Sequence, residues 1–270
     1  MAHANIVRGI RVVSVERGYD PRDFALVPFG GAGPMHGSPV ARDLKMPRVM
    51  VPPAPGILCA MGQLISDLRH DFVETHIIPF ARLGEKGALA LIEALRARAD
   101  AHLAEDGVDP SRREIEIRID LRYVGQSFAL PIQTDPSQPG WWQALPEAFN
   151  AAHLARFGHA DPDVPLEVVG FNVTGIGRIE KPLLPEIPTG DATPPSIALR
   201  GQRRVYFEPG DGDDKGAWHQ ASVWSRDGLL AGNVLHGPAA IEEVSATTIL
   251  YPGDRAEILP SGNIIVEVAE

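Results

Sequence analysis

An apolar segment followed by a glycine-rich turn is the feature that most constrains the fold of this chain. Residues 24–29 form a short apolar run without polar alternation, which is typical of a strand buried on both faces. The turn that follows, Phe-Gly-Gly-Ala-Gly-Pro-Met-His at 29–36, is rich in glycine, which lacks a Cβ and allows positive φ and close approach of another group. Pro34 has the φ preferred in a first helical turn, so the pattern predicts a strand, a tight turn and a helix.

The segments around this turn predict a βαβ unit. A helix is expected at 34–44 and a second apolar strand at 48–51, which two prolines follow. A crossover of this kind joins parallel strands with a right-handed connection. Two strands cannot bury both faces of a parallel sheet, so later segments or another polypeptide must complete it. Further helices are expected on either side, at 4–17 and 56–68.

The rest of the chain has the pattern of an α+β region followed by a β-rich region. Periodicity predicts, in order, a helix at 85–105, strands at 115–123 and 127–132, a helix at 141–157 and a strand at 167–178. A proline-rich linker is expected at 182–195, an exposed turn at 211–216, and short strands over 203–270 that end with one at 263–268. We therefore expect three domains: residues 1–73, 74–182 and 183–270.

The glycine turn is also the strongest candidate binding site. Backbone N–H groups at the start of a helix have no partner within it and can bind an anion. The turn is not the dinucleotide fingerprint, because the third glycine would stand at His36, and it is not a P-loop, because no Gly-Lys-Ser/Thr follows. Gly30, Gly31, Gly33 and His36 are the candidate ligand contacts. The alternatives are a plain turn for the glycines and a packed helical position for the histidine.

Two other polar clusters are weaker candidates. Asp67, His70 and Asp71 combine carboxylates with an imidazole near the expected end of a helix, where a structural role is favoured over a metal site. The second cluster surrounds a glycine at a strand end, where hairpin contacts are favoured over substrate contacts. It consists of Arg122, Tyr123 and Gln126. No metal site is predicted, and the residues assign no catalytic group.

The charge, the apolar segments and the cysteine content limit the partners and the cellular compartment of this protein. The 270 residues carry a formal net charge of −10, which argues against nucleic acid and anionic membranes as partners. No apolar stretch is long enough to span a bilayer. The single cysteine, Cys59, excludes an internal disulfide and fits a reducing compartment, so we expect a cytoplasmic protein.

Several motifs together resemble the hydantoinase A / 5-oxoprolinase family. In the family's order they are Arg-Val-Val-Ser-Val-Glu-Arg-Gly at 11–18, Asp-Pro-Arg-Asp-Phe at 20–24, the glycine turn at 29–36, Pro-Arg-Val-Met-Val-Pro-Pro at 47–53, Pro-Gly at 55–56, Asp-Leu-Arg-His-Asp at 67–71, Asp-Leu-Arg-Tyr-Val-Gly-Gln at 120–126, Gly-Pro-Ala-Ala-Ile-Glu-Glu at 237–243, Ala-Thr-Thr at 246–248 and Tyr-Pro-Gly at 251–253. The resemblance implies an α/β plus α+β fold. It would be the C-terminal piece of an actin-like ATPase domain, of the sugar-kinase and heat-shock-protein type, followed by a β-rich C-terminal domain.

The resemblance also implies an ATP-using enzyme. Family members cleave cyclic amides such as hydantoins and 5-oxoproline by phosphorylating the amide oxygen, and relatives carboxylate ketones. The turn at 30–33 would lie near the adenosine end of ATP, which we expect to bind with Mg only together with an N-terminal half. That half begins with a strand and an Asp-x-Gly-Gly-Thr phosphate loop, which these residues do not contain. The expected partners are that half or a companion subunit, a small cyclic amide and further copies in an oligomer.

Two alternatives to the hydrolase stay open. The missing phosphate loop favours a non-catalytic fragment or interaction module for the isolated chain. A subunit of a related ATP-dependent ketone carboxylase would differ in substrate rather than in architecture. Because the other half should pack there, exposed apolar surface is expected at residues 4–29.

Overall fold

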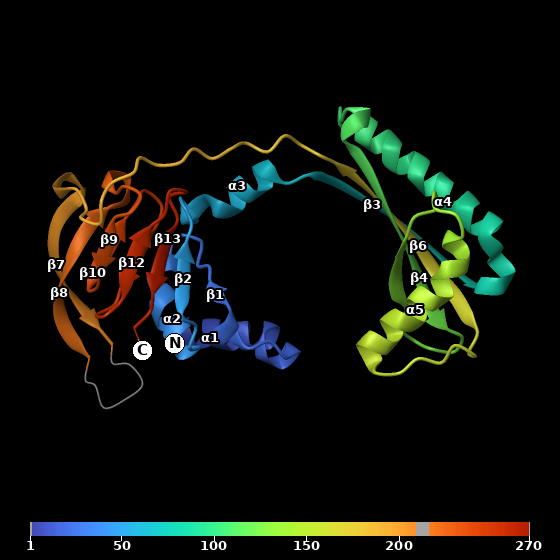
Figure 1. Cartoon of the computed structure of the whole chain (residues 1–270), viewed down its shortest axis with the longest axis horizontal. Coiled ribbons are helices and arrows are strands. Elements are labelled where there is room, and N and C mark those ends of the chain that lie inside the picture. The colour runs from blue at the N-terminus through green and yellow to red at the C-terminus, as the bar shows by residue number, and fades with distance from the viewer. Residues whose placement is uncertain (1, 209–215, 270) are drawn as a thin grey trace. The chain divides into compact units, whose positions relative to one another are not determined.

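The computed structural model describes residues 2–208 and 216–269 and divides the chain into two compact units (Figure 1). Unit 1 combines Met1–Leu64 with Pro182–Glu270, and unit 2 is Ile65–Lys181. Residues 211–215 of the expected exposed turn lie outside the described residues. Among the residues that are described, no helix is both long and apolar enough to cross a membrane.

The first sheet of unit 1 joins the two ends of the chain. Its strands lie in the order β1 (Ala25–Leu26), β2 (Arg48–Val51), β13 (Ile264–Glu267), β12 (Arg255–Ile258) and β9 (Val234–His236). The pairing of β1 with β2 is parallel, which confirms the predicted βαβ unit. On the other side of β2, β13 pairs antiparallel, with Ile264 opposite Val51. Later segments of the chain therefore extend this sheet.

Short helices surround the first two strands. They are α1 (Ala2–Val13), α2 (Gly37–Asp43) and α3 (Leu58–Ile65), with 3-10 turns η1 (Val15–Arg17), η2 (Pro21–Asp23), η3 (Gly33–His36) and η4 (Pro55–Ile57). The helix predicted at 34–44 is present, with its first turn in the 3-10 form. The strand predicted at 24–29 is only two residues long, because Pro28 lacks an N–H and the backbone turns at Gly30.

The second sheet of unit 1 is built from the C-terminal part of the chain. Its order is β11 (Thr247–Leu250), β10 (Ala239–Glu242), β8 (Ala217–Ser225) and β7 (Leu199–Phe207), with 3-10 turns η6 (Ser196–Ala198) and η7 (Arg226–Gly228) before and after the β7–β8 pair. Side chains from both sheets and from α2 share one hydrophobic core, in which Val40, Val51, Ile241, Leu250 and Ile264 are fully buried.

Unit 2 is a four-stranded antiparallel sheet with two helices. The strand order is β3 (Leu68–Pro79), β6 (Leu166–Gly177), β4 (Arg113–Tyr123) and β5 (Leu130–Thr134), and the helices are α4 (Phe80–Glu105) and α5 (Trp141–Phe157), with η5 (Pro110–Arg112) before β4. Ile119, Leu121 and Phe171 of the sheet form one core with Ile92 of α4 and Phe149 of α5. Both helices therefore pack on the same face of the sheet.

The observed elements of unit 2 confirm most predictions and correct one. The alternating strand at 115–123 and its hairpin partner are β4 and β5, and the helices predicted at 85–105 and 141–157 are α4 and α5. The helix predicted at 56–68 ends at Ile65, and a long strand, β3, begins at Leu68. The alternating pattern of half-buried and exposed residues in β3 is the signal that sequence reasoning missed.

The domain division also differs from the expectation of 1–73, 74–182 and 183–270. The first and last of these segments form one unit, because β13 pairs with β2 and both sheets of unit 1 share a core. The middle segment begins earlier, at Ile65, because β3 pairs with β6 along almost its whole length.

Candidate functional site

The glycine turn lies at the carboxyl end of β1 and is held by the segment that follows β2. Gly30 has φ +83°, which favours glycine, and its N–H donates to the carbonyl oxygen of Pro55 at 2.8 Å. Just before Pro55, Ala54 adopts the left-handed region with φ +48°, which is strained for a residue with a side chain. Both turns therefore stand at the ends of neighbouring parallel strands, the place where α/β sheets bind ligands.

A third turn, at 243–246, packs into the space that two glycines leave. A Cβ on Gly31 would lie 3.2 Å from the carbonyl oxygen of Ser245, and a Cβ on Gly56 would lie 2.6 Å from the same oxygen. Part of the glycine requirement is thus explained by contact within the chain rather than by a ligand. We call residues 29–36, 54–57 and 243–246 the three-turn site.

Gly33 and His36 make ordinary packing contacts. A Cβ on Gly33 would meet Pro28 at 3.5 Å, an ordinary van der Waals distance, so close approach does not require glycine there. His36 Nδ1 lies 2.8 Å from Nε2 of His3 in α1. Burial, with a smaller contribution from His3, lowers the pKa of His36, so this imidazole is neutral at pH 7. The ring of His36 thereby connects η3 to α1, and its role as a ligand contact stays a prediction.

A buried arginine holds the third turn in place through hydrogen bonds. The Arg226 guanidinium donates to Glu243 Oε1 at 2.6 Å, to the carbonyl oxygen of Gly262 at 2.8 Å and to that of Val51 at 3.2 Å. The Arg226 and Glu243 side chains are only 11% and 8% exposed. Because Val51 ends β2, this arginine ties the third turn to the carboxyl end of the sheet. Sequence reasoning did not find Arg226, which carries no local motif.

The surface of the three-turn site is apolar. Phe29 and Ile57 are each 52% exposed and Val244 is fully exposed, and they adjoin Gly30, Gly56 and Ser245 in the sequence. These turns contain no lysine or arginine, and the carboxylate of Glu243 is already paired with Arg226. The arrangement suits an uncharged group, such as a planar ring or a protein surface, better than a phosphate.

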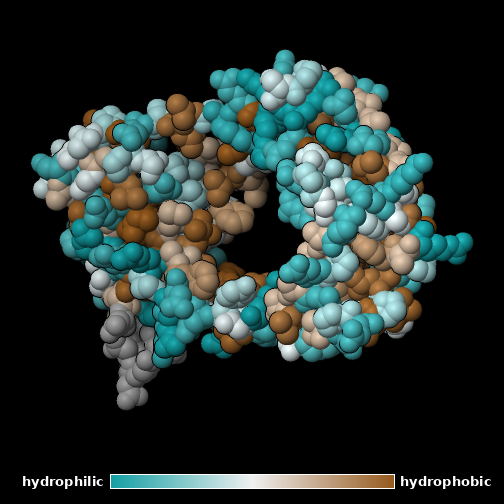
Figure 2. Space-filling model, turned by 45° about the vertical axis from the view of Figure 1, so that its right-hand side comes forward, coloured by the Kyte–Doolittle hydropathy of each residue, from teal (hydrophilic) through white to brown (hydrophobic). Residues whose placement is uncertain are grey.

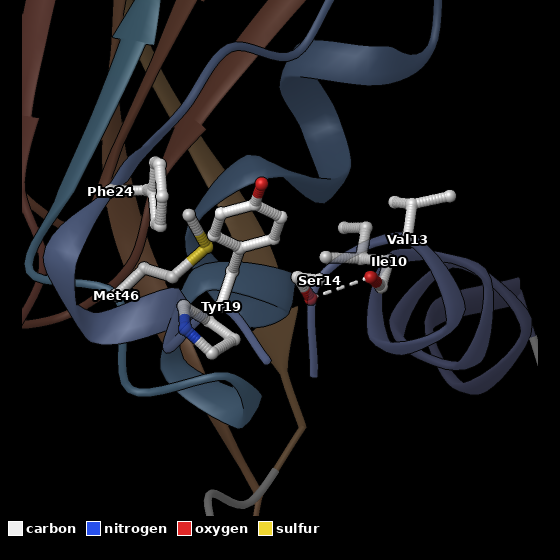
Figure 3. Close-up of a pocket in the computed structure, with 7 residues that line it drawn as sticks. Ile10, Val13, Ser14, Tyr19, Phe24 and Met46 are labelled. Atoms are coloured by element: carbon white, nitrogen blue, oxygen red, sulfur yellow. Dashed lines mark hydrogen bonds between the residues drawn. The ribbon is translucent and has the colours of Figure 1, made fainter. Parts of the chain in front are cut away.

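A separate apolar pocket lies beside α1 (Figure 3). It has a volume of about 230 Å³. The residues that line it are Ile10, Val13, Ser14, Tyr19, Pro21, Phe24 and Met46. The hydroxyl of Ser14 donates to the carbonyl oxygen of Ile10 at 2.7 Å, so this hydroxyl is already satisfied within the chain. The pocket therefore offers apolar contact only.

In unit 2, Asp67, His70 and Asp71 do not gather around one point. They lie just before and on β3, not at a helix end as expected, and each carboxylate or ring has its own partner. His70 Nε2 lies 2.5 Å from Asp106 Oδ2, and Asp71 accepts from Thr174 Oγ1 at 2.6 Å. Over the described part of the chain, no group of three or more His, Cys, Asp or Glu side chains is arranged to hold a metal ion.

Asp67 instead ties the two segments by which the chain enters and leaves unit 2. Its carboxylate accepts from Lys181 Nζ at 2.7 Å, from Arg178 Nη1 at 2.8 Å and from the backbone N–H of Ile179 at 3.1 Å. Hydrogen bonds from Lys181 and Arg178 lower the pKa of Asp67 to about 2. This carboxylate is ionised and fully engaged, which supports the structural reading of the cluster.

The cluster around Gly125 connects β4 to neighbouring elements. Arg122 pairs with Glu167 at 2.7 Å, and Gln126 Nε2 lies 3.3 Å from His153 Nε2. The hydroxyl of Tyr123 donates to Asn150 at 2.6 Å and accepts from the N–H of Asp161 at 2.7 Å. These contacts support the structural alternative for Arg122, Tyr123 and Gln126, because their polar groups are used within unit 2.

Comparison with known proteins gives the family. The sequence pattern described as hydantoinase/oxoprolinase matches residues 1–72, and that of the hydantoinase/oxoprolinase C-terminal domain matches residues 88–261, more than half of the chain. This chain belongs to the hydantoinase/oxoprolinase family. The motifs that suggested the resemblance all lie within these two matches, the first of which contains the glycine turn.

The family relatives that match are longer than this chain. Caprolactamase subunit alpha of Pseudomonas jessenii is 31% identical over 97% of this chain and 37% of its own length. The 5-oxoprolinase 1 of Arabidopsis thaliana is 28% identical over 99% of this chain and 20% of its own length. Among solved structures, a nucleotide-free acetone carboxylase aligns with a TM-score of 0.81 at 25% identity over 99% of this chain and 39% of its own. The ATP-dependent caprolactamase of Pseudomonas jessenii aligns with a TM-score of 0.74 at 31% identity. The alignment covers 99% of this chain and 39% of the caprolactamase chain. The chain thus spans well under half the length of these relatives.

Proposed function

We propose that this chain is one part of an ATP-dependent hydrolase that opens cyclic amides, and that it acts together with a polypeptide that carries the phosphate-binding half. The observation that carries the proposal is the 31% identity to the ATP-dependent caprolactamase over 99% of this chain. The family name and the similarity to a 5-oxoprolinase agree with a cyclic amide as substrate. In this proposal the first sheet of unit 1 belongs to an actin-like ATPase domain, and the complete enzyme is oligomeric and works in the cytoplasm.

The residues of the three-turn site fit one end of ATP and not the other. Phe29 and Ile57 offer apolar surface for a base, and the turn at Gly30 brings backbone rather than side chain to the surface. Triphosphate and Mg²⁺ need cations and free carboxylates, which these turns do not offer. We therefore infer that this chain positions the adenosine end, while the companion polypeptide supplies the groups that hold the phosphates and Mg²⁺. When bound, ATP would supply the phosphoryl group that activates the amide oxygen.

A ketone carboxylase is the second candidate function. The acetone carboxylase aligns with the higher of the two TM-scores, 0.81 against 0.74, although its sequence identity is lower. The same residues would serve either reaction, since the substrate differs while the use of ATP is shared. A non-catalytic interaction module remains the third candidate for the isolated chain.

The experiment that tests the proposal is a substrate screen on the assembled protein. The chain is purified with the companion polypeptide, which is expected to contain an Asp-x-Gly-Gly-Thr loop. Phosphate release from ATP is then measured in the presence of 5-oxoproline, hydantoin or caprolactam. The proposal predicts stimulation by at least one cyclic amide and opening of its ring. Stimulation only by acetone or acetophenone with bicarbonate would support the carboxylase instead. No stimulation by any of these compounds would support the interaction module.

A further inference from the structure

We propose that two copies of this chain associate through β3, the outermost strand of the sheet in unit 2. The two β3 strands pair antiparallel about a two-fold axis at Thr75 and join the two sheets into one. This interface is independent of the reaction that the enzyme catalyses. The residues that form it all belong to unit 2.

The edge of the sheet that β3 forms is long and open. β3 has 12 residues, and among the described residues its backbone forms a ladder with β6 alone. An edge strand leaves a row of backbone N–H and C=O groups that can pair with a further strand. Within β3 the only proline is Pro79, its last residue. A strand from outside unit 2 can therefore extend the sheet along most of this edge.

The middle of β3 has similar chemistry when it is read in either direction. Its residues are, in order, Val73, Glu74, Thr75, His76 and Ile77. In an antiparallel pair centred on Thr75, Val73 lies opposite Ile77 of the partner copy. Glu74 then lies opposite His76 of the partner copy. Apolar pairs and pairs of opposite charge both stabilise neighbouring strands. A two-fold interface needs this kind of self-complementarity, because both copies present the same patch.

Two large apolar side chains of β3 are exposed on the face of the sheet that the helices leave open. Phe72 packs against the core beneath α4 and α5, so its chain neighbour Val73 points away from them. Val73 is 61% exposed and Ile77 is 59% exposed. On the side of unit 2 that Figure 2 shows, hydrophilic residues predominate and hydrophobic ones form small groups. Pairing Val73 with Ile77 of a second copy removes both from water, which favours association.

The charged side chains along this edge balance each other. Arg69 Nη2 donates to Asp71 Oδ1 at 3.0 Å. Arg98 Nη1 of α4 lies 3.5 Å from Glu74 Oε1, and His76 Nε2 lies 3.2 Å from Glu74 Oε2. The edge is therefore close to neutral, although the whole chain has a formal net charge of −10. Two copies meet here without like-charge repulsion, and a strongly acidic or basic segment gains little, which favours a second copy as the occupant.

A β-bulge near the end of β3 does not close the edge. The register with β6 shifts between Thr75 and Ile78, so two residues of β3 stand where β6 has one. Bulges and charged residues protect many edge strands from pairing. In β3, however, exposed and half-buried residues continue to alternate through the bulge. Val73 and Ile77 therefore remain on one face of the strand, as the proposed pairing requires.

The test measures self-association of the whole chain by sedimentation velocity over a range of concentrations. Thr75 lies opposite its own copy, so Thr75→Asp brings two carboxylates together and Thr75→Lys brings two ammonium groups together. We expect wild type to dimerise at micromolar concentration and each variant to associate at least tenfold more weakly. An equimolar mixture of the two variants should dimerise again, because a carboxylate then faces an ammonium group. Gln133→Asp is the matched control, since Gln133 is exposed on β5 at the opposite edge of the same sheet, and it should dimerise like wild type.

A covalent cross-link reports the position of the two-fold axis. Cys59 is the single cysteine, so Cys59→Ser gives a chain without a thiol. Directly opposed residues of antiparallel strands have Cα atoms about 4.5–5.5 Å apart, within the range of about 4.4–6.8 Å that a disulfide spans. In this background Thr75→Cys should form a disulfide-linked dimer on mild oxidation with air, and Gln133→Cys should stay monomeric on a non-reducing gel.

Three results would overturn the inference. They are a wild-type chain that stays monomeric at every concentration, a dimer that Thr75→Asp leaves intact, and a mixture of the two Thr75 variants that does not recover association. Exposed apolar side chains also occur at residues 4–29 of unit 1, as the sequence predicted, and association through them would give the second result. Circular dichroism checks that each variant folds. A dimer that forms as expected in a protein that opens no cyclic amide would contradict the proposed function and leave the interface intact.

Discussion

At the scale of single residues, the glycine turn shows what a local pattern can and cannot predict. Its position after β1 and before a helix follows from apolar content and glycine alone, and both were predicted. The sequence could not predict that Ser245, almost two hundred residues further on, fills the space beside Gly31 and Gly56. Such a contact depends on how distant strands pair, which no local window contains. Its role as a ligand contact stays a prediction.

Gly56 provides a direct test of this packing. A methyl group there would overlap the backbone oxygen of Ser245, which cannot move as a flexible side chain would. We expect Gly56→Ala to destabilise unit 1 by about 1–3 kcal/mol, the usual cost of overpacking. Gly9→Ala is the matched control, since its Cβ would meet nothing within 4 Å in the middle of α1. That control should be neutral or stabilise by about 0.5–1 kcal/mol. Urea midpoints measure both, and equal effects would contradict the packing.

Asp67 predicts a specific dependence of stability on pH. Its pKa is about 2 in the folded chain against an ordinary value of 3.8, so its ion pairs contribute stability above about pH 4 and lose it as pH falls toward 2. Asp67→Asn should therefore lower the urea midpoint at pH 7, and the difference from wild type should shrink between pH 4 and 2.

Asp20 is the control for that experiment. Its pKa is also about 2, chiefly through hydrogen bonds from Arg22, only two residues away. Because so local a pair persists in the unfolded chain, Asp20→Asn should change the pH dependence less. A difference between wild type and Asp67→Asn that does not vary with pH would show that the ion pairs have no such role.

At the scale of elements, strands with a clear period were predictable and edge or distant pairings were not. β4 alternates between buried apolar and half-buried polar residues, and this pattern alone identified it. β3 has no fully buried residue, so its alternation carried a weak signal and its start was read as the end of a helix. The pairing of β13 with β2 joins residues more than two hundred positions apart, which periodicity does not report.

The Arg226–Glu243 pair should hold the ends of several elements together. Removing one partner of a buried pair leaves the other charge uncompensated, which typically costs about 3–5 kcal/mol. We expect Glu243→Ala to lower the free energy of unfolding of unit 1 by about this amount. The neighbouring Glu242 pairs with Arg203 at 3.6 Å on the surface, and Glu242→Ala should cost less than about 1 kcal/mol. Thermal unfolding of the two variants compares them, and similar costs would contradict the role of the buried pair.

At the scale of the whole molecule, the sequence predicted the middle region but not the union of the two ends. Residues 65–181 form a unit with its own core, and Asp67 ties its entering and leaving segments. A separately produced 65–181 fragment should therefore fold alone. Trp141 and Trp142 are buried in its core and report folding by fluorescence. Cooperative unfolding of the fragment is the expected result, and an unfolded fragment under conditions that keep the full chain folded would refute the division.

We propose that this chain contributes one part of an ATP-using enzyme. The most direct measurement is ATP hydrolysis in the presence of a cyclic amide, by the chain alone and after addition of the polypeptide that carries the phosphate-binding half. We expect no turnover and weak ATP binding by the chain alone, and amide-dependent phosphate release once the two are combined. Amide-dependent turnover by the isolated chain, or none by a complex that has demonstrably formed, would contradict it.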